Sequence, residues 1–196
     1  MLQTFRQAAL MLIVLTVICG GLYPALVTGI AKTLFPNQAE GSMIKDGNGK
    51  VIGSPFIGQH FTNPTYFWGR LSATSPVPYN SAASSGSNLS IGSGDLMKNV
   101  QARVDALRLA DPNNHEPVPV DLVTASASGL DPHISIAAAN YQIKRVATAR
   151  GISEEYVKKM VALHTEGRTL GILGEPVVNV LLLNLALDRA SREGGK

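Results

Sequence analysis

An uncharged apolar run near the amino terminus constrains this chain more than any other feature. No charged residue lies between Arg6 and Lys32, and leucine, isoleucine and valine recur throughout the run. A helix needs about 20 mostly apolar residues to cross the ~30 Å hydrocarbon core of a bilayer. Residues 8–30 are therefore predicted to form one transmembrane helix, preceded by a short tail, 1–7, and followed by a soluble domain, 31–196.

A cleaved signal peptide is the alternative explanation for this run. Signal peptides have an apolar region of about 7–15 residues and then a small-x-small cleavage site. Here the apolar sequence continues past Gly20 to Ile30. A lipoprotein signal at Cys19 is disfavoured because the bulky Ile18 precedes it and more apolar sequence follows. A retained anchor is therefore favoured.

Small residues recur on one face of the predicted helix. Gly21, Ala25 and Gly29 are spaced by four, and small residues at that spacing let a second membrane helix approach closely. Pro24 lacks the N–H of a helical hydrogen bond and is expected to kink the helix beside this face. The face is a candidate partner interface; the alternative is that glycine and alanine are simply common in membrane helices.

The remaining composition narrows the classes of function. Roughly 160 residues follow the anchor, which is enough for one hydrophobic core. The formal net charge is +3 without a dense basic cluster, so a nucleic-acid surface is not indicated. The only cysteine, Cys19, lies in the apolar run, which excludes a disulfide framework. Positive charges flank the run on both sides, so charge does not fix its orientation.

The sequence after the anchor predicts a mixed α/β (α+β) domain with a small sheet and about four helices. Residues 42–53 are typical of strand, turn and strand, because Asp-Gly and Asn-Gly pairs supply the positive φ of tight turns. Residues 57–61 could extend this sheet, and the short apolar run at 120–125 is a further candidate strand.

Apolar spacing and capping residues predict the helices. They are expected at residues 95–110, 131–150, 153–165 and 176–190. Asp131-Pro132 and Ser153 are typical helix starts, Gly151 is a typical stop, and Arg103 lies off the apolar stripe of its helix. The inner face of the second helix is predicted to hold Ile136, Ala139, Ile143, and Val146 or Ala147. The last helix is apolar over only about a dozen residues, which favours a buried core helix over a second membrane span.

The most aromatic segment of the chain, residues 61–70, precedes a long polar loop. Residues 71–94 are dense in Ser, Asn, Gly, Pro and Ala, and such loops are often functional; a turn-rich break follows at 111–119. Because aromatic side chains anchor interfaces, this region is a candidate docking surface. The candidate contacts are Tyr66, Trp68, Tyr79 and Asn88. The alternative, that most of these aromatics lie in the core, is favoured.

Recognisable motifs of catalysis and ligand binding are missing from the sequence. It has no Walker-type phosphate loop, no dinucleotide fingerprint and no nucleophile elbow, and its four histidines are far apart. Catalytic residues and metal ligands are therefore not predicted, and cofactor-binding residues stay unknown. Two classes remain open: an accessory subunit of a membrane complex, and a membrane-anchored enzyme or ligand-binding domain with an unrecognised site.

Sequence blocks in one order over nearly the whole chain carry a family resemblance. The blocks are Gly20-Gly21-Leu22-Tyr23-Pro24, Ile57-Gly58-Gln59-His60-Phe61, Tyr66-Phe67-Trp68-Gly69-Arg70, Pro78-Tyr79-Asn80, Ser85-Gly86-Ser87-Asn88-Leu89, residues 123–131, and Pro176-Val177-Val178-Asn179. They resemble the C subunits of the bacterial Kdp potassium-transporting ATPase. One departure is visible: some members read Ser-Gly-Gly-Ser-Asn where this chain reads Ser-Ser-Gly-Ser-Asn at 84–88.

The resemblance implies a non-catalytic accessory subunit of an ATP-driven, high-affinity potassium uptake complex, needed for assembly. It implies three partners: a channel-like potassium-translocating subunit, a P-type ATPase pump subunit and a small membrane peptide. It also implies a single-pass protein of the bacterial inner membrane with its soluble domain on the outer, periplasmic side.

The same resemblance implies a role with ATP but no tightly bound cofactor. Family members are described as catalytic chaperones that raise the ATP affinity of the pump subunit in a transient complex. Because there is little ATP outside the cell, a physical alternative is that the domain braces the potassium-translocating subunit near its outer entrance.

Overall fold

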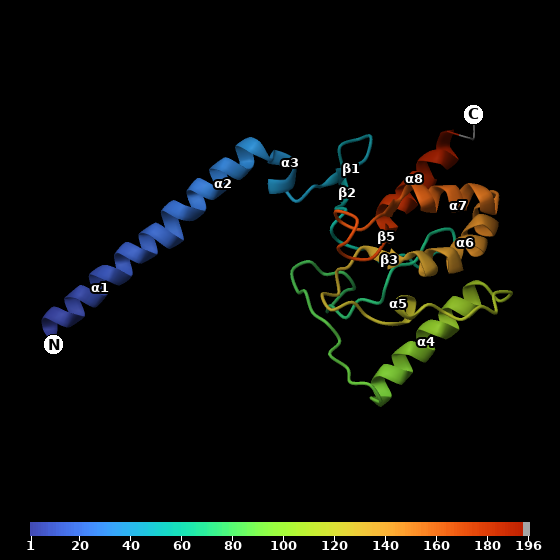
Figure 1. Cartoon of the computed structure of the whole chain (residues 1–196), viewed down its shortest axis with the longest axis horizontal. Helices are drawn as coiled ribbons and strands as arrows, with labels where there is room; N and C mark the ends of the chain where they lie inside the picture. The colour runs from blue at the N-terminus through green and yellow to red at the C-terminus, as the bar shows by residue number, and fades with distance from the viewer. Residues whose placement is uncertain (194–196) are drawn as a thin grey trace. The chain divides into compact units, whose positions relative to one another are not determined.

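The computed structural model describes residues 1–193, which belong to two compact units, Met1–Ser54 and the chain from Pro55 onward. Figure 1 shows the long amino-terminal helix of the first unit and the mixed α/β fold of the second. One apolar amino-terminal helix followed by helices and small sheets confirms the predicted fold class.

The first unit begins with a continuous helical run of 33 residues, Leu2–Leu34. It comprises α1 (Leu2–Val17), a π-helical turn (Ile18–Leu22) and α2 (Tyr23–Leu34). It is apolar and long enough to cross a membrane, and none of its most apolar window is buried. Within the part of the chain that the structure describes, it is the one helix that meets this criterion.

The hydrogen-bond pattern of this helix changes next to Pro24. The backbone N–H of Tyr23 donates to the carbonyl of Ile18, five residues earlier. Because a proline cannot donate a backbone hydrogen bond, a wider turn beside it lets the helix continue instead of ending.

A short helix, α3 (Pro36–Ala39), and a two-stranded hairpin complete the first unit. Strands β1 (Ile44–Lys45) and β2 (Val51–Gly53) are antiparallel. In the turn, the Asp46 carboxylate accepts hydrogen bonds from two backbone N–H groups at 2.9 Å each, and Gly49 has a φ of 79°. The predicted strand, turn and strand are confirmed, but the extension over 57–61 is wrong, since this sheet has two strands.

The second unit has a three-stranded sheet and five helices among its described residues. The helices are α4 (Gly94–Ala110), α5 (Val120–Val123), α6 (Ile136–Arg150), α7 (Glu154–Leu163) and α8 (Val180–Glu193). The antiparallel strands, in spatial order, are β3 (His133–Ser135), β5 (Val177–Asn179) and β4 (Thr165–Glu166). In Figure 1, α4 and α8 lie on opposite sides of this unit, with α6 between them.

Local signals explain most of these helix boundaries. The side chains of Ser93, Ser135 and Ser153 accept hydrogen bonds from N–H groups of the first turns of α4, α6 and α7. Gly151 ends α6 with a φ of 67°, as predicted.

The helices predicted at 131–150 and 176–190 are present, but both begin later than expected, and for the same reason. Residues 133–135 and 177–179 pair with each other as strands, so α6 begins after Ser135 instead of at Asp131, and α8 begins after Asn179 instead of at Pro176. Residues 120–123 form the short helix α5 where a strand was expected.

The core of the second unit lies between α6, α7, α8 and the sheet. Of the predicted inner face of α6, Ala139, Ile143, Val146 and Ala147 are buried, whereas Ile136 is exposed. The apolar middle of α8 is buried, as predicted for a core helix.

Candidate functional site

The small-residue face of the first helix is uncovered in this chain. A methyl group added at Gly21 or Gly29 would meet no other atom within 4 Å, and Ala25 is exposed. Gly21 itself lies in the π-helical turn. Within the first unit, a second helix could therefore approach this face without a steric clash.

Two aromatic side chains of the segment 61–70, by contrast, belong to the core. Phe67 and Trp68 are buried. For these two residues, the interpretation as core residues therefore applies, and not the interpretation as a docking surface. Trp68, a predicted partner contact, is only 6% exposed. The half-buried Tyr66 donates from its hydroxyl to Asp188 at 3.2 Å.

Two amide side chains supply the backbone hydrogen bonds that a neighbouring strand would otherwise make to this segment. Asn184 of α8 accepts from the Phe67 N–H at 2.8 Å and donates to the Phe67 carbonyl at 3.0 Å. Gln142 of α6 does the same for Trp68, at 2.8 and 3.1 Å. Because buried backbone groups must be paired, these amides let an extended segment without strand partners pass through the core.

Two guanidinium groups lie against the Trp68 ring. The Arg103 and Arg145 guanidinium carbons lie 5.0 and 4.7 Å from the ring centroid, a cation–π geometry. Their hydrogen bonds go mainly to carbonyl oxygens, such as Leu122 for Arg103 and Tyr66 for Arg145. Burial lowers the pKa of Arg145 to about 10, so this group stays charged at neutral pH; burial also lowers the pKa of Arg103.

Tyr79, another predicted contact, anchors the start of the long loop. Its φ is 58°, and its hydroxyl donates to the Arg70 carbonyl at 2.6 Å. Burial raises the pKa of Tyr79 to about 12, so this hydroxyl remains a donor. Gly58 and Gly69 make room for the ring: a methyl group at either would collide with Tyr79.

The first half of the loop is tightly held. The Ser72 hydroxyl donates to the Gly129 carbonyl at 2.7 Å, and it accepts from the Tyr79 N–H at 2.8 Å. A methyl group on Gly129 or Gly86 would lie within 2.7 Å of facing backbone oxygen. These hydrogen bonds and close backbone contacts hold residues 72–86 in one conformation.

The second half of the loop contains Asn88 and the departure noted in the sequence. Asn88 is exposed and has a φ of 51°. The positive-φ residues among those described do not include Ser85, so serine in place of glycine there causes no backbone strain. Ser85 also donates its N–H to the Ser128 carbonyl at 3.0 Å.

Four ionisable side chains lie in a row at one end of the sheet, which we call the ionic row: Arg70, Asp131, His133 and Glu166. Arg70 forms a salt bridge with Asp131 at 3.1 Å, and the His133 ring lies 3.5 Å from Asp131 and 3.9 Å from Glu166. The hydrogen bond with Asp131 raises the pKa of His133. Burial acts to raise the pKa of Asp131, but hydrogen bonds from His133 and Arg70 outweigh it and lower that pKa.

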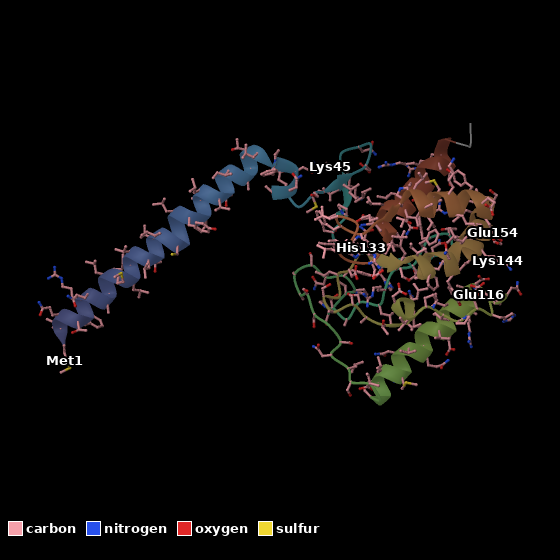
Figure 2. All side chains as sticks on the ribbon, in the orientation of Figure 1. Met1, Lys45, Glu116, His133, Lys144 and Glu154 are labelled. Carbon is pink, nitrogen blue, oxygen red and sulfur yellow. The ribbon has the colours of Figure 1, made fainter. Side chains whose placement is uncertain are left out.

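A wide polar pocket of about 930 Å³ lies elsewhere on the second unit. Figure 2 shows Glu116, Lys144 and Glu154 gathered along the same edge; with Lys158 they line the pocket. Two lysines face two glutamates, so the charge is balanced. A nucleoside triphosphate needs a surplus of positive charge or a cradle of backbone N–H groups, and this donor set does not fit it.

The roles of several residues in this region were not predicted from the sequence. Arg103 was predicted to lie off the apolar stripe, yet it stacks on Trp68. Gln142 and Asn184 are polar residues inside apolar helical stripes, and that interruption is the signal that could have identified them as buried amides. His133 gave no signal, because Glu166 approaches it only through the folded sheet.

Comparison with known proteins gives the family. The family model for KdpC, described as "K+-transporting ATPase, c chain", matches residues 5–189. A potassium-transporting ATPase KdpC subunit of Herpetosiphon aurantiacus is 61% identical over 185 residues, covering 94% of this chain and 95% of that protein. The corresponding protein of Sorangium cellulosum is 60% identical over 190 residues, covering 97% and 100%. On this similarity, the chain belongs to the KdpC family of potassium-transporting ATPase subunits.

Proposed function

We propose that this chain is a non-catalytic accessory subunit of an ATP-driven, high-affinity potassium uptake complex and that it serves assembly and stability. The observation that carries the proposal is similarity over nearly the full length to proteins named as subunits of potassium-transporting ATPases. A helix able to cross a membrane at the amino terminus supports it.

The partners we infer are a channel-like potassium-translocating subunit, a P-type ATPase pump subunit and a small membrane peptide. The helix offers the face Gly21, Ala25 and Gly29 to a partner helix, where small residues allow close packing. Leucine at Gly21 and Ala25 should then lower recovery of the complex, and unchanged recovery would refute this contact.

The long loop is the second inferred contact. Its first half is rigid around Tyr79, and its second half exposes Asn88. A rigid base with an exposed polar tip can bind a partner at little cost in conformational entropy. Substituting Asn88, which contributes nothing to the core, tests this contact through assembly and potassium transport.

We infer that any effect on nucleotide affinity is exerted through the pump subunit, with no cofactor bound tightly to this chain. The balanced charge of the polar pocket supports this. Calorimetric titration of the isolated chain with ATP should show no binding. In parallel, the pump subunit is titrated with ATP in the presence and absence of this chain, and any difference in its ATP affinity should appear there. ATP binding by the isolated chain would contradict the inference.

We also propose that the second unit lies on the outer side of the bacterial inner membrane. A cysteine at Ser87, in a chain whose Cys19 is replaced by serine, should react with an impermeant maleimide added to intact cells. Reaction only after lysis would place the unit on the cytoplasmic side.

The function itself is tested in a bacterium that lacks its own C subunit and its other potassium uptake systems. Full-length chain should restore growth at low potassium and co-purify with the other subunits in mild detergent. A lone monomer with its own enzymatic turnover would instead support the second class, a membrane-anchored enzyme.

A further inference from the structure

A short excursion between β4 and β5 displays aliphatic side chains to solvent. We call residues 168–175 the apolar turn; it is the loop that precedes β5 in Figure 1. Its leucine and isoleucine side chains are strongly exposed: 86% for Leu170, 72% for Ile172 and 58% for Leu173. Clustered exposed aliphatic groups mark interaction sites more often than isolated ones do.

The apolar turn has a fixed shape. At its base, one guanidinium nitrogen of Arg168 donates to both carboxylate oxygens of Glu175, at 2.8 and 2.7 Å. Above this ion pair, the Thr169 N–H donates to the Leu173 carbonyl at 2.8 Å, and the Leu173 N–H donates back at 3.0 Å. The aliphatic side chains are therefore presented in one arrangement.

Leucine is an unfavourable residue for the tip of this turn. Leu170 and Gly171 have φ values of 55° and 76°, and the Ile172 N–H donates to the Thr169 carbonyl at 3.3 Å. Tight turns with two successive positive-φ residues favour asparagine, aspartate and glycine, and a branched, bulky side chain there is rare. Leu170 gains no burial within the chain in return, so a contact outside the chain explains it best.

Charge favours a protein over a lipid surface as the occupant. Between Thr165 and Pro176 the formal charge is −1, from Glu166 and Glu175 against Arg168, and the segment has no aromatic residue. Segments that bind anionic membranes carry lysine and arginine beside aromatic side chains.

We propose that the apolar turn docks into an apolar recess on another protein subunit of the potassium-transporting complex, with Leu170 and Ile172 as the inserted side chains. This inference rests on the proposed function, because it requires that the chain assembles with other subunits.

The first test separates folding from docking. Leu170→Asn suits the backbone of the turn, so the variant should unfold at the same denaturant concentration as wild type, or a higher one. It should nevertheless bind the remaining subunits about 10- to 150-fold more weakly, the effect of removing one buried leucine. Ile172→Ser, which leaves the positive-φ positions untouched, should weaken binding similarly. Leu109→Gln is the matched control, because Leu109 on α4 is 82% exposed and lies outside the turn.

The second test identifies the occupant. A photoreactive phenylalanine analogue at Ile172, irradiated in membranes that hold the assembled complex, should cross-link to a partner subunit. Cross-links to lipid alone, or wild-type binding by both turn variants, would overturn the docking proposal while the proposed function stands. Failure of the wild-type chain to assemble at all would overturn both.

Discussion

The aromatic segment and the apolar turn show how poorly residue type alone predicts a surface. Phe67 and Trp68 carry the side chains most typical of interface anchors, yet both are buried and their backbones are bonded by side-chain amides. The apolar turn contains ordinary aliphatic residues, yet Leu170 and Ile172 point into solvent. What decides the difference is whether the fold supplies backbone partners and cover, and this depends on residues far away in the sequence.

The largest effect is expected from removing the side-chain amide that bonds the backbone of the aromatic segment. Asn184→Leu keeps the side-chain size but leaves the buried N–H and carbonyl of Phe67 without partners. Each unsatisfied group costs about 1–3 kcal/mol, so the loss of both partners should lower the free energy of unfolding by about 2–6 kcal/mol. Trp68 is the only tryptophan, so its fluorescence reports unfolding of the full-length chain in detergent.

Asn140→Leu is the control for that measurement, because Asn140 is exposed on α6 and surface substitutions usually change stability by less than about 0.5 kcal/mol. Equal stability of the two variants would show that the amides do not hold the segment.

A second substitution tests the packing around Tyr79. Gly58→Ala places a methyl group against the Tyr79 ring and the Asp131 carbonyl, and overpacking of this kind typically costs about 1–3 kcal/mol. Thermal unfolding followed by circular dichroism measures it. Gly167→Ala, where an added methyl group meets nothing within 4 Å, should be nearly neutral; an equal loss at both positions would contradict the packing argument.

The apolar turn should respond in the opposite direction. A leucine in the left-handed region costs roughly 1–2 kcal/mol, and asparagine tolerates that region better. Leu170→Asn should therefore raise the free energy of unfolding by up to about 1 kcal/mol, measured by urea unfolding. A clear loss of stability would mean that Leu170 supports the fold, which would weaken its assignment to an external contact.

The smallest effect concerns His133, which lies beside Asp131 and Glu166. Its pKa is raised in the folded chain, first by the hydrogen bond with Asp131. The resulting stabilisation is complete below the unfolded pKa of about 6.5 and is lost as the pH rises through the raised folded pKa. Wild type should therefore lose stability as the pH rises above about 6.5 and through the raised pKa of His133, and His133→Gln should lose less. Parallel curves for the two proteins would exclude a charged His133 from the ionic row.

Elements with local signals were predictable from the sequence. The helix at 95–110, the stop at Gly151 and the cap at Ser153 depend on residues within a few positions of each other, and the structure has all of them. The strands at 133–135 and 177–179 were missed because three residues carry too little pattern, and each forms a strand only by pairing with the other.

The candidate site was less predictable for the same physical reason. The small-residue face needed only helical spacing. The positions of Trp68 and Tyr79 depended on Asn184, Gln142 and two glycines, whose roles appear only when distant segments meet. The exposure of Leu170 could not be predicted, because leucine is a typical core residue and is not typical of a turn position with positive φ.

The continuous helix at the amino terminus has a mechanical consequence. At 33 residues and about 1.5 Å per residue it is roughly 50 Å long, whereas a bilayer's hydrocarbon layer is about 30 Å thick. In a bilayer that this helix crosses, the surplus of about 20 Å would have to be taken up by tilting of the helix or by helical turns that protrude beyond the hydrocarbon layer. The tilt would then change with the thickness of the bilayer.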